Sequence, residues 1–373
     1  MMFKSKWFSV WFVLAFLVWI ALFSTFDSFA FLKDHWYYPA VMVFAAFVAG
    51  LTPQSGGAIA FPALSVFLHI DRVLARDFSM MIQSIGLTSA SIFILTHKDT
   101  VLRNYRPVLM FLPVCAAGFV LGMNTLQSMP VYLIQAFFLS LITTFVAAYY
   151  LHRQRGTKAS LAVATVGEGV WLGLILFLGG MVTSLFGTGT DILLYTILIT
   201  RFSMNEKAAT RLAIVTMTGM SILGFAYRAF VDHGLSHYQF DTWLCAYPVV
   251  LFMAPLGAFV LRKVHVNWLL LAIVILDVFQ LLYFNFSRPS QNKTLASAVF
   301  CALFSVVFYL LLRRIRVKRA EALEPTSRQR CRSELLPPGC RIGGNNRANS
   351  RNGAAIVARK LDSKCIGSRN EGR

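Results

Sequence analysis

Two long apolar stretches of this chain are each interrupted near the middle by a short turn-forming segment. Residues 37–70 are broken by GLTPQSGG (50–57), and residues 162–200 are broken by GTGTD (187–191). Backbone N–H and C=O groups that leave a helix inside hydrocarbon carry a large energetic cost unless protein or a water-filled cavity receives them. Each break therefore predicts a buried contact or a cavity, and this prediction limits the fold more than any other feature.

The remaining apolar runs predict an all-α polytopic membrane protein. Hydrophobic residues make up 57% of the 373 and charged residues only 14%. Several uncharged runs approach or exceed the roughly 20 residues that a membrane-spanning helix needs. We expect full spans at residues 7–30, 79–96, 107–123, 131–151, 208–229, 243–261, 268–284 and 295–312.

The first run could also be a signal peptide, because Lys4 and Lys6 precede it. It is long, rich in Trp and Phe, and lacks a small-residue cleavage site, so a retained helix is favoured. The six cysteines lie within spans or in the tail, without the spacing of a metal site or a disulfide framework. We therefore expect no metal and no cofactor.

Loop charge favours re-entrant hairpins over single crossings at the two breaks. With the N-terminus in the cytoplasm, single crossings would divide the nineteen Lys and Arg before residue 313 into nine inside and ten outside. If each broken stretch instead returns to the side it came from, thirteen lie inside and six outside. Only the second arrangement follows the positive-inside rule.

An odd number of crossings per half makes the second half an inverted copy of the first. RPVLMFLP (106–113) is echoed by YPVVLFMAP (247–255), and a constant offset of 133 pairs four identical residues. Chance similarity among apolar helices is the alternative. The expected domains are an N-terminal helix (1–36), a first repeat (37–158), a second repeat (159–286), a final helix (287–312) and a tail (313–373).

The breaks are expected to bind a small anion. Glycine permits positive φ and close approach, and helices that restart near Ala58 and Asp191 would direct free N–H groups inward. Packing and ordinary N-capping are the alternative reading. Polar residues on the following helices could join the site or bond between helices. The predicted substrate-binding set is Gln54, Ser55, Gly56, Gly57, Gln83, Thr188, Gly189, Thr190, Asp191, Arg211 and Thr216.

Three charged residues in or near the apolar region have open roles. Asp277 lies deep within its span, where a carboxyl is costly, so it is a candidate proton carrier, as is Asp191. A hydrogen bond to a neighbouring helix is the alternative for Asp277. Arg211 lies one turn into its helix, where it could face an anion or extend to the cytoplasmic surface.

The net charge of +19 is concentrated at the C-terminal end, where sixteen of the thirty-five Lys and Arg follow residue 312. That tail has no hydrophobic periodicity and is expected to be disordered and cytoplasmic. RRIRVKR directly follows the last span, so contact with anionic lipid is favoured over nucleic-acid binding.

The chain resembles the TauE/SafE sulfite exporter family, also called the toluene-sulfonate uptake permease family. That family carries two Gly-rich hairpin motifs, which here read PQSGGAIAFP and GTGTDILLYTIL, within residues 37–284. Pro53 and Ser55 stand where glycines are usual, and Tyr195 and Thr196 stand where the first motif has Pro62. The resemblance implies a permease in a bacterial-type cytoplasmic membrane for sulfite, another sulfur oxyanion or an organosulfonate. The direction of transport, the coupling ion and the oligomeric state stay open, a homo-oligomer included.

Four alternatives stand beside a sulfur-oxyanion carrier. An intramembrane serine hydrolase is disfavoured, because Pro53 stands where its motif needs glycine and no histidine lies inside a later span. We therefore expect no enzyme. A channel, a carrier for a different small organic anion, and a non-transporting scaffold or sensor remain. Deleting residues 313–373 would abolish the output of a scaffold that signals through the tail, but not the flux of a carrier.

Overall fold

The structure is a computed structural model, and it describes residues 5–26, 28–97, 100–151, 158–161, 165–263, 266–287 and 289–310. Within these ranges every regular element is a helix, and the only β-type pairing is an isolated bridge between Lys158 and Met204. Among the described residues, seven helices are long and apolar enough to cross a membrane. The all-helical, polytopic membrane architecture is confirmed. The expected tail, residues 313–373, lies outside the described residues.

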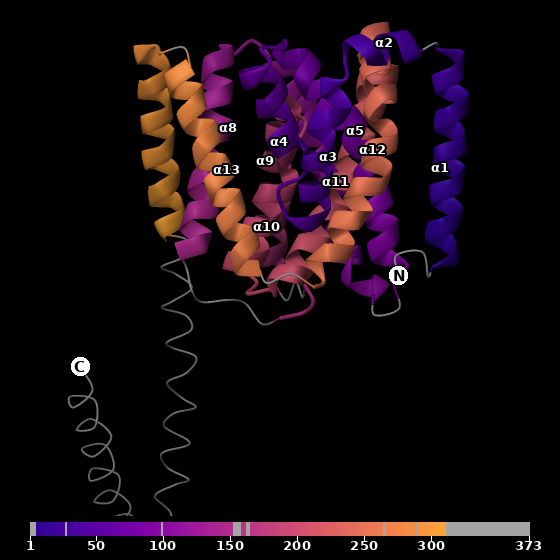
Figure 1. The fold of residues 1–373 in the computed structure, drawn as a ribbon. Coiled ribbons are helices and arrows are strands. Elements are labelled where there is room, and N and C mark those ends of the chain that lie inside the picture. The colour runs from indigo at the N-terminus through magenta and orange to yellow at the C-terminus, as the bar shows by residue number, and fades with distance from the viewer. Residues whose placement is uncertain are drawn as a thin grey trace, which may run out of the picture. The chain divides into compact units, whose positions relative to one another are not determined.

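The first half begins with a helix at one edge of the bundle and then forms the first broken stretch (Figure 1). Trp19 Nε1 of the edge helix donates to the Leu244 carbonyl at 2.9 Å. The elements of this half are α1 (Lys6–Thr25), α2 (Ser28–Asp34), α3 (Tyr37–Leu51), α4 (Gly57–Pro62), η2 (Ala63–Phe67), α5 (Arg72–Leu95), η3 (Leu102–Asn104), α6 (Arg106–Leu109), α7 (Leu112–Thr125) and α8 (Val131–Leu151).

The second half repeats the order of a broken stretch followed by long helices. Its elements are α9 (Val166–Phe186), α10 (Thr190–Thr200), α11 (Glu206–Ala226), η4 (Tyr227–Val231), α12 (His237–Leu261) and α13 (Val266–Ser287), and a last helix covers Gln291–Leu310. In Figure 1, α4 lies in the upper half of the bundle and α10 in the lower half.

Three elements differ from the sequence-based boundaries. The expected span at 7–30 divides into α1, which ends at Thr25, and α2, which begins at Ser28. The expected span at 107–123 divides into α6 and the 14-residue α7, in which Pro113 falls in the first turn. Proline is favoured in a first turn because its missing N–H would have no partner there. The first arm of the second broken stretch, α9, has 21 residues, which is enough for a full crossing.

Glycines allow two helix pairs to approach at backbone contact. A Cβ at Gly50 of α3 would overlap the Ala254 carbonyl of α12, and one at Gly257 of α12 would overlap the Phe47 carbonyl of α3. The pair of α7 and α9 is built in the same way, because Gly118 and Gly180 each face a backbone carbonyl of the other helix. Small residues permit this close packing in membranes, where no hydrophobic driving force draws helices together.

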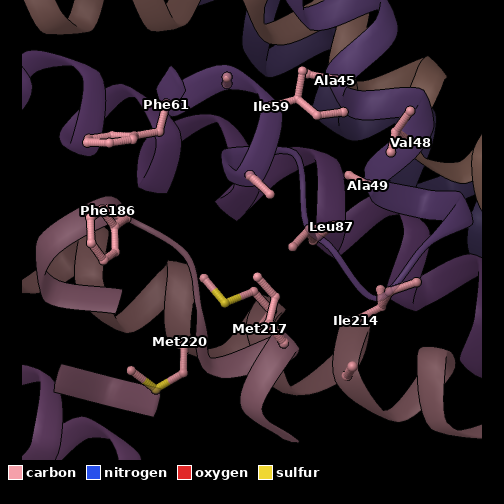
Figure 2. Close-up of a cluster of buried hydrophobic side chains, with 14 of the residues drawn as sticks. Ala45, Val48, Ala49, Ile59, Phe61, Leu87, Phe186, Ile214, Met217 and Met220 are labelled. Atoms are coloured by element: carbon pink, nitrogen blue, oxygen red, sulfur yellow. The ribbon is translucent and has the colours of Figure 1, made fainter. Parts of the chain in front are cut away.

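The apolar core wraps around the two breaks and draws on both halves of the chain. Figure 2 draws Ala45, Ala49 and Ile59 from the first half and Ile214 and Met217 from the second as members of one buried hydrophobic cluster. Phe61 of α4 and Phe186 of α9 form an edge-on ring pair with centroids 5.3 Å apart. These side chains close the core on the apolar sides of the breaks, so the polar turns are held inside the protein.

Candidate functional site

The two broken turns meet inside the bundle, although 133 residues separate them. The hydroxyls of Ser55 and Thr188 are hydrogen-bonded to each other. The Ser55 N–H donates to Asp191 Oδ2 at 2.6 Å. Ser55, Thr188 and Asp191 are all at most 3% exposed. The turns that the sequence placed in the hydrocarbon region therefore satisfy their polar groups largely against each other.

The Asp191 carboxylate holds both turns together. Besides the Ser55 N–H, it accepts hydrogen bonds from the Gly189 N–H at 3.1 Å and from the Thr188 hydroxyl at 3.3 Å. The sequence predicted that these amide groups would be bare and would face a bound anion. In the structure a carboxylate of the chain itself takes two of them, so the site already contains an anionic group with the donor set of an oxyanion.

The glycines of the two turns act in different ways. Gly187 and Gly189 have φ of 73° and 133°, which non-glycine residues rarely adopt, so they form the turn itself. Gly56 of the first turn has φ of −53°, so the conformation of that residue is open to other amino acids and does not require glycine. At Gly57 a Cβ would overlap the Ser79 hydroxyl and lie 2.8 Å from Thr188 Cβ. Gly57 therefore serves close approach between the turns.

Gln83 and Thr190 connect the turns to neighbouring helices. Gln83 Nε2 on α5 donates to the Gly187 carbonyl at 3.0 Å and to the Ser79 carbonyl at 2.9 Å. The Thr190 N–H donates to the Thr183 hydroxyl at 3.1 Å, and the two threonine hydroxyls lie 2.8 Å apart. Gln83 Oε1 is buried without a hydrogen-bond partner. These bonds fix the second turn against α5 and α9.

Asp277 is joined to the first turn by its neighbour in space, Gln54. Gln54 Nε2 donates to Asp277 Oδ2 at 2.8 Å, and Asp277 is fully buried on α13. The Thr143 hydroxyl of α8 donates to the Asp277 backbone carbonyl at 3.2 Å. The carboxyl that the sequence singled out by depth alone therefore lies next to the broken turn, one residue from Ser55 along the chain.

Two predicted site residues lie apart from these contacts. The Thr216 hydroxyl donates to the Leu212 carbonyl of its own helix at 2.8 Å. Arg211 is half-buried near the start of α11. Among the hydrogen bonds of the described residues, none joins Thr216 or Arg211 to either broken turn.

A buried ionic network beside the second turn was not anticipated. Asp77 is fully buried and forms two salt bridges, one with Arg76 Nη2 at 2.7 Å and one with Arg228 Nη2 at 2.7 Å. Arg76 Nη1 also donates to Gln127 Oε1 at 2.6 Å. The Arg76 carbonyl lies against Gly187, where a Cβ would be 2.5 Å from it. The adjacent Arg-Asp pair inside an otherwise apolar helix is the sequence signal that could have indicated this network.

A cavity of about 290 Å³ lies elsewhere, between η2, the starts of α5 and α8, and the end of α13. Its lining includes His69, Arg72, Gln135 and Lys293. No residue of the two broken turns lines it. The turns themselves are closed to solvent, with Gln54, Ser55 and Thr188 all buried.

A bundle of apolar helices with two buried broken turns in contact defines a polytopic membrane protein of transporter type. The family model for Sulfite exporter TauE/SafE matches residues 38–284, and the chain belongs to that family. Family membership makes it a membrane transporter of the sulfite exporter type rather than an enzyme. A search of curated proteins and a search of solved structures each gave no match.

Proposed function

We propose that this protein is a secondary transporter that moves a small anion across the cytoplasmic membrane by alternating access. The substrate class is sulfite, another sulfur oxyanion or an organosulfonate. Substrate binds between the two broken turns, and one half of the chain rocks against the other to open the site to each side in turn. Both termini lie on the cytoplasmic side, and Asp277 or Asp191 couples the step to a proton.

One observation carries the proposal: the donor set that holds Asp191. Two backbone N–H groups, from Ser55 and Gly189, and the Thr188 hydroxyl converge on a carboxylate. A sulfite or sulfonate group presents the same kind of acceptor oxygens as a carboxylate. Substrate therefore competes with Asp191 for these donors. In the structure the Asp191 carboxylate accepts all three of the hydrogen bonds.

The pattern of helix packing supports an inverted repeat. In an inverted repeat, α3 would correspond to α9, α5 to α11 and α7 to α12. A two-fold axis that relates these helices would turn the contact between α3 and α12 into the contact between α9 and α7. Both contacts are extensive, and α5 packs on α11 as the axis requires. Ser55 and Thr188 are bonded across this axis and are separated by the offset of 133 that aligns the two halves.

The return arms of the two breaks support re-entrant hairpins. One arm consists of the six residues of α4 and the five of η2, and the other is the 11-residue α10. At about 1.5 Å per residue each spans about 16 Å, roughly half of a 30 Å hydrocarbon core. Return arms of this length reach only part of the way across the core, whereas the first arm of the second break, α9, is long enough for a full crossing.

The experiment is uptake of [³⁵S]sulfite into proteoliposomes containing the full chain. Ser55→Ala and Thr188→Val each remove one hydroxyl from the contact between the turns. We expect both to lower flux at least about tenfold, since each hydroxyl contributes to binding in a dry site. Thr210→Val is the matched control, because its buried hydroxyl bonds only within α11. Normal sulfite flux in both site variants would refute the site, and absence of flux from the unmodified protein would remove sulfite as a substrate.

A further inference from the structure

Three buried acceptor oxygens without donors gather beside the first broken turn. Gln54 Oε1, Asp277 Oδ1 and Gln280 Oε1 have no hydrogen-bond partner among the residues that the structure describes, and all three side chains are at most 2% exposed. An unpaired buried polar atom is costly, and such atoms in a native protein are normally satisfied by a ligand or ion. Because all three are acceptors, the missing partner is a donor or a cation.

The three oxygens belong to one locality. The Gln54 amide is bonded through its nitrogen to Asp277, so its oxygen lies within the same contact. Asp277 and Gln280 are three residues apart on α13, which places their side chains on the same helix face, about 5–6 Å apart at Cβ. The buried face of α13 also includes Ile273 and Phe284, so this face points into the protein.

No cation of the chain balances the Asp277 carboxyl among the described residues. Its one hydrogen-bond partner there is the neutral Gln54 amide. The other titratable side chains that the structure describes on α13, on α8 and on the last helix include Tyr283, Tyr132, Tyr150, Cys301, Tyr309 and Lys293. Lys293 lies over the Phe284 ring, about two turns from Asp277 along α13. Among the hydrogen bonds of the described residues, none joins Tyr283, Tyr132, Tyr150, Cys301 or Tyr309 to the Asp277 carboxyl. An isolated buried carboxylate needs a positive charge or a proton.

We propose that Asp277, Gln54 and Gln280 bind the monovalent cation, a proton or Na⁺, that drives the transporter. The inference rests on the proposed function, and it deepens the coupling role of Asp277 by naming its oxygen partners. Carboxyl and amide oxygens are ligands that suit a hard monovalent cation, and either cation neutralises Asp277. Gln54 turns its amide oxygen toward the bound cation and withdraws its Nε2 from Asp277.

The chain connects this cation site directly to the substrate site. Gln54 Nε2 donates to Asp277. The next residue, Ser55, donates its N–H to Asp191, and its hydroxyl is hydrogen-bonded to the Thr188 hydroxyl. A change in the Gln54 side chain therefore reaches the Ser55 donors through a single peptide unit. Cation binding at Asp277 and release of the Asp191 clamp are thus linked through consecutive residues, which is the coupling that secondary transport requires.

The test measures the melting temperature of the purified full chain in detergent, by intrinsic tryptophan fluorescence and without sulfite. One series replaces choline chloride by NaCl at constant ionic strength and pH, and a second varies pH without Na⁺. A ligand that binds only the folded form raises the melting temperature. Stabilisation by NaCl identifies Na⁺, and stabilisation by acid alone identifies the proton.

Asp277→Asn is expected to lose whichever dependence the unmodified protein shows. Gln280→Leu is expected to weaken apparent cation affinity about tenfold or more, or to shift the pH midpoint. Asn124→Leu is the control, because this exposed amide donates only to the Val120 carbonyl of its own helix, α7. If Asp277→Asn cannot be purified, Gln280→Leu decides alone.

The proposal is overturned if the unmodified protein responds to neither ion, or if the dependence survives in both variants. Because sulfite is absent, this result is separable from the proposed function. Sulfite flux in vesicles without any cation dependence would remove the cation site and keep the transporter. Cation-dependent stability without flux of any sulfur oxyanion would keep the cation site and remove the proposed transport of sulfur oxyanions.

Discussion

Asp191→Asn tests whether one carboxylate clamps the two broken turns. Asn keeps one oxygen, which can stay on the Ser55 N–H, and replaces the other by an NH₂ group that faces the Gly189 N–H. The Gly189 donor then has no acceptor, which costs about 1–3 kcal/mol, and the Ser55 bond loses its charge assistance, about 1 kcal/mol. We expect the free energy of unfolding to fall by about 2–4 kcal/mol.

The assay is unfolding of purified protein in mixed dodecyl maltoside and SDS micelles, with Asp241→Asn as control. The Asp241 carboxyl is paired with the exposed His237 ring at 3.1 Å. The Asp241→Asn substitution should therefore lower the free energy of unfolding by less than about 1 kcal/mol. Sodium sulfite at matched ionic strength should then stabilise Asp191→Asn more than the unmodified protein, because the competing carboxylate has gone. Equal stability of Asp191→Asn and the unmodified protein would contradict the clamp, and equal stabilisation by sulfite would contradict the competition.

Three further substitutions probe the surroundings of the site. Gly57→Val should lower stability by about 1–3 kcal/mol and abolish sulfite flux, since its Cβ overlaps Ser79; normal flux would show that the turns need not touch. Asp77→Asn should cost about 3–5 kcal/mol in the same micelle assay, because it leaves the Arg76 and Arg228 guanidiniums poorly compensated; a change below about 1 kcal/mol would contradict the network. Gly180→Leu should prevent recovery of folded protein by gel filtration, since its side chain meets α7 backbone; a normal monodisperse peak would refute that packing.

Local pattern was sufficient to predict the helices and the breaks. Hydrophobic length defines a membrane helix because hydrocarbon offers backbone groups no partner, so the spans and the interruptions near Ser55 and Thr188 can be read from the chain directly. The restart of helix near Ala58 and Asp191 was predicted to within one residue. The division of 107–123 into α6 and α7 was missed, although Pro113, which is favoured in the first turn of a helix, is a local signal for it.

The depth of Asp277 marked it as a functional candidate, but its partners could not be derived from the chain. Gln54 and Asp277 are 223 residues apart, and nothing local to either indicates the other. The same holds for Asp77, whose partner Arg228 is 151 residues away. Such pairs depend on which helix faces meet, and in a membrane those faces are selected by small-residue contacts such as Gly50 against α12.

The sequence by itself determined that this chain crosses a membrane many times and that two polar turns interrupt its hydrophobic runs, since both follow from the solvation of each segment alone. Tertiary structure alone decided that the turns bond each other and that Asp191, from one turn, takes the donors of both. Solvation cost requires a buried turn to find partners, but only the packing of distant helices selects which groups those partners are.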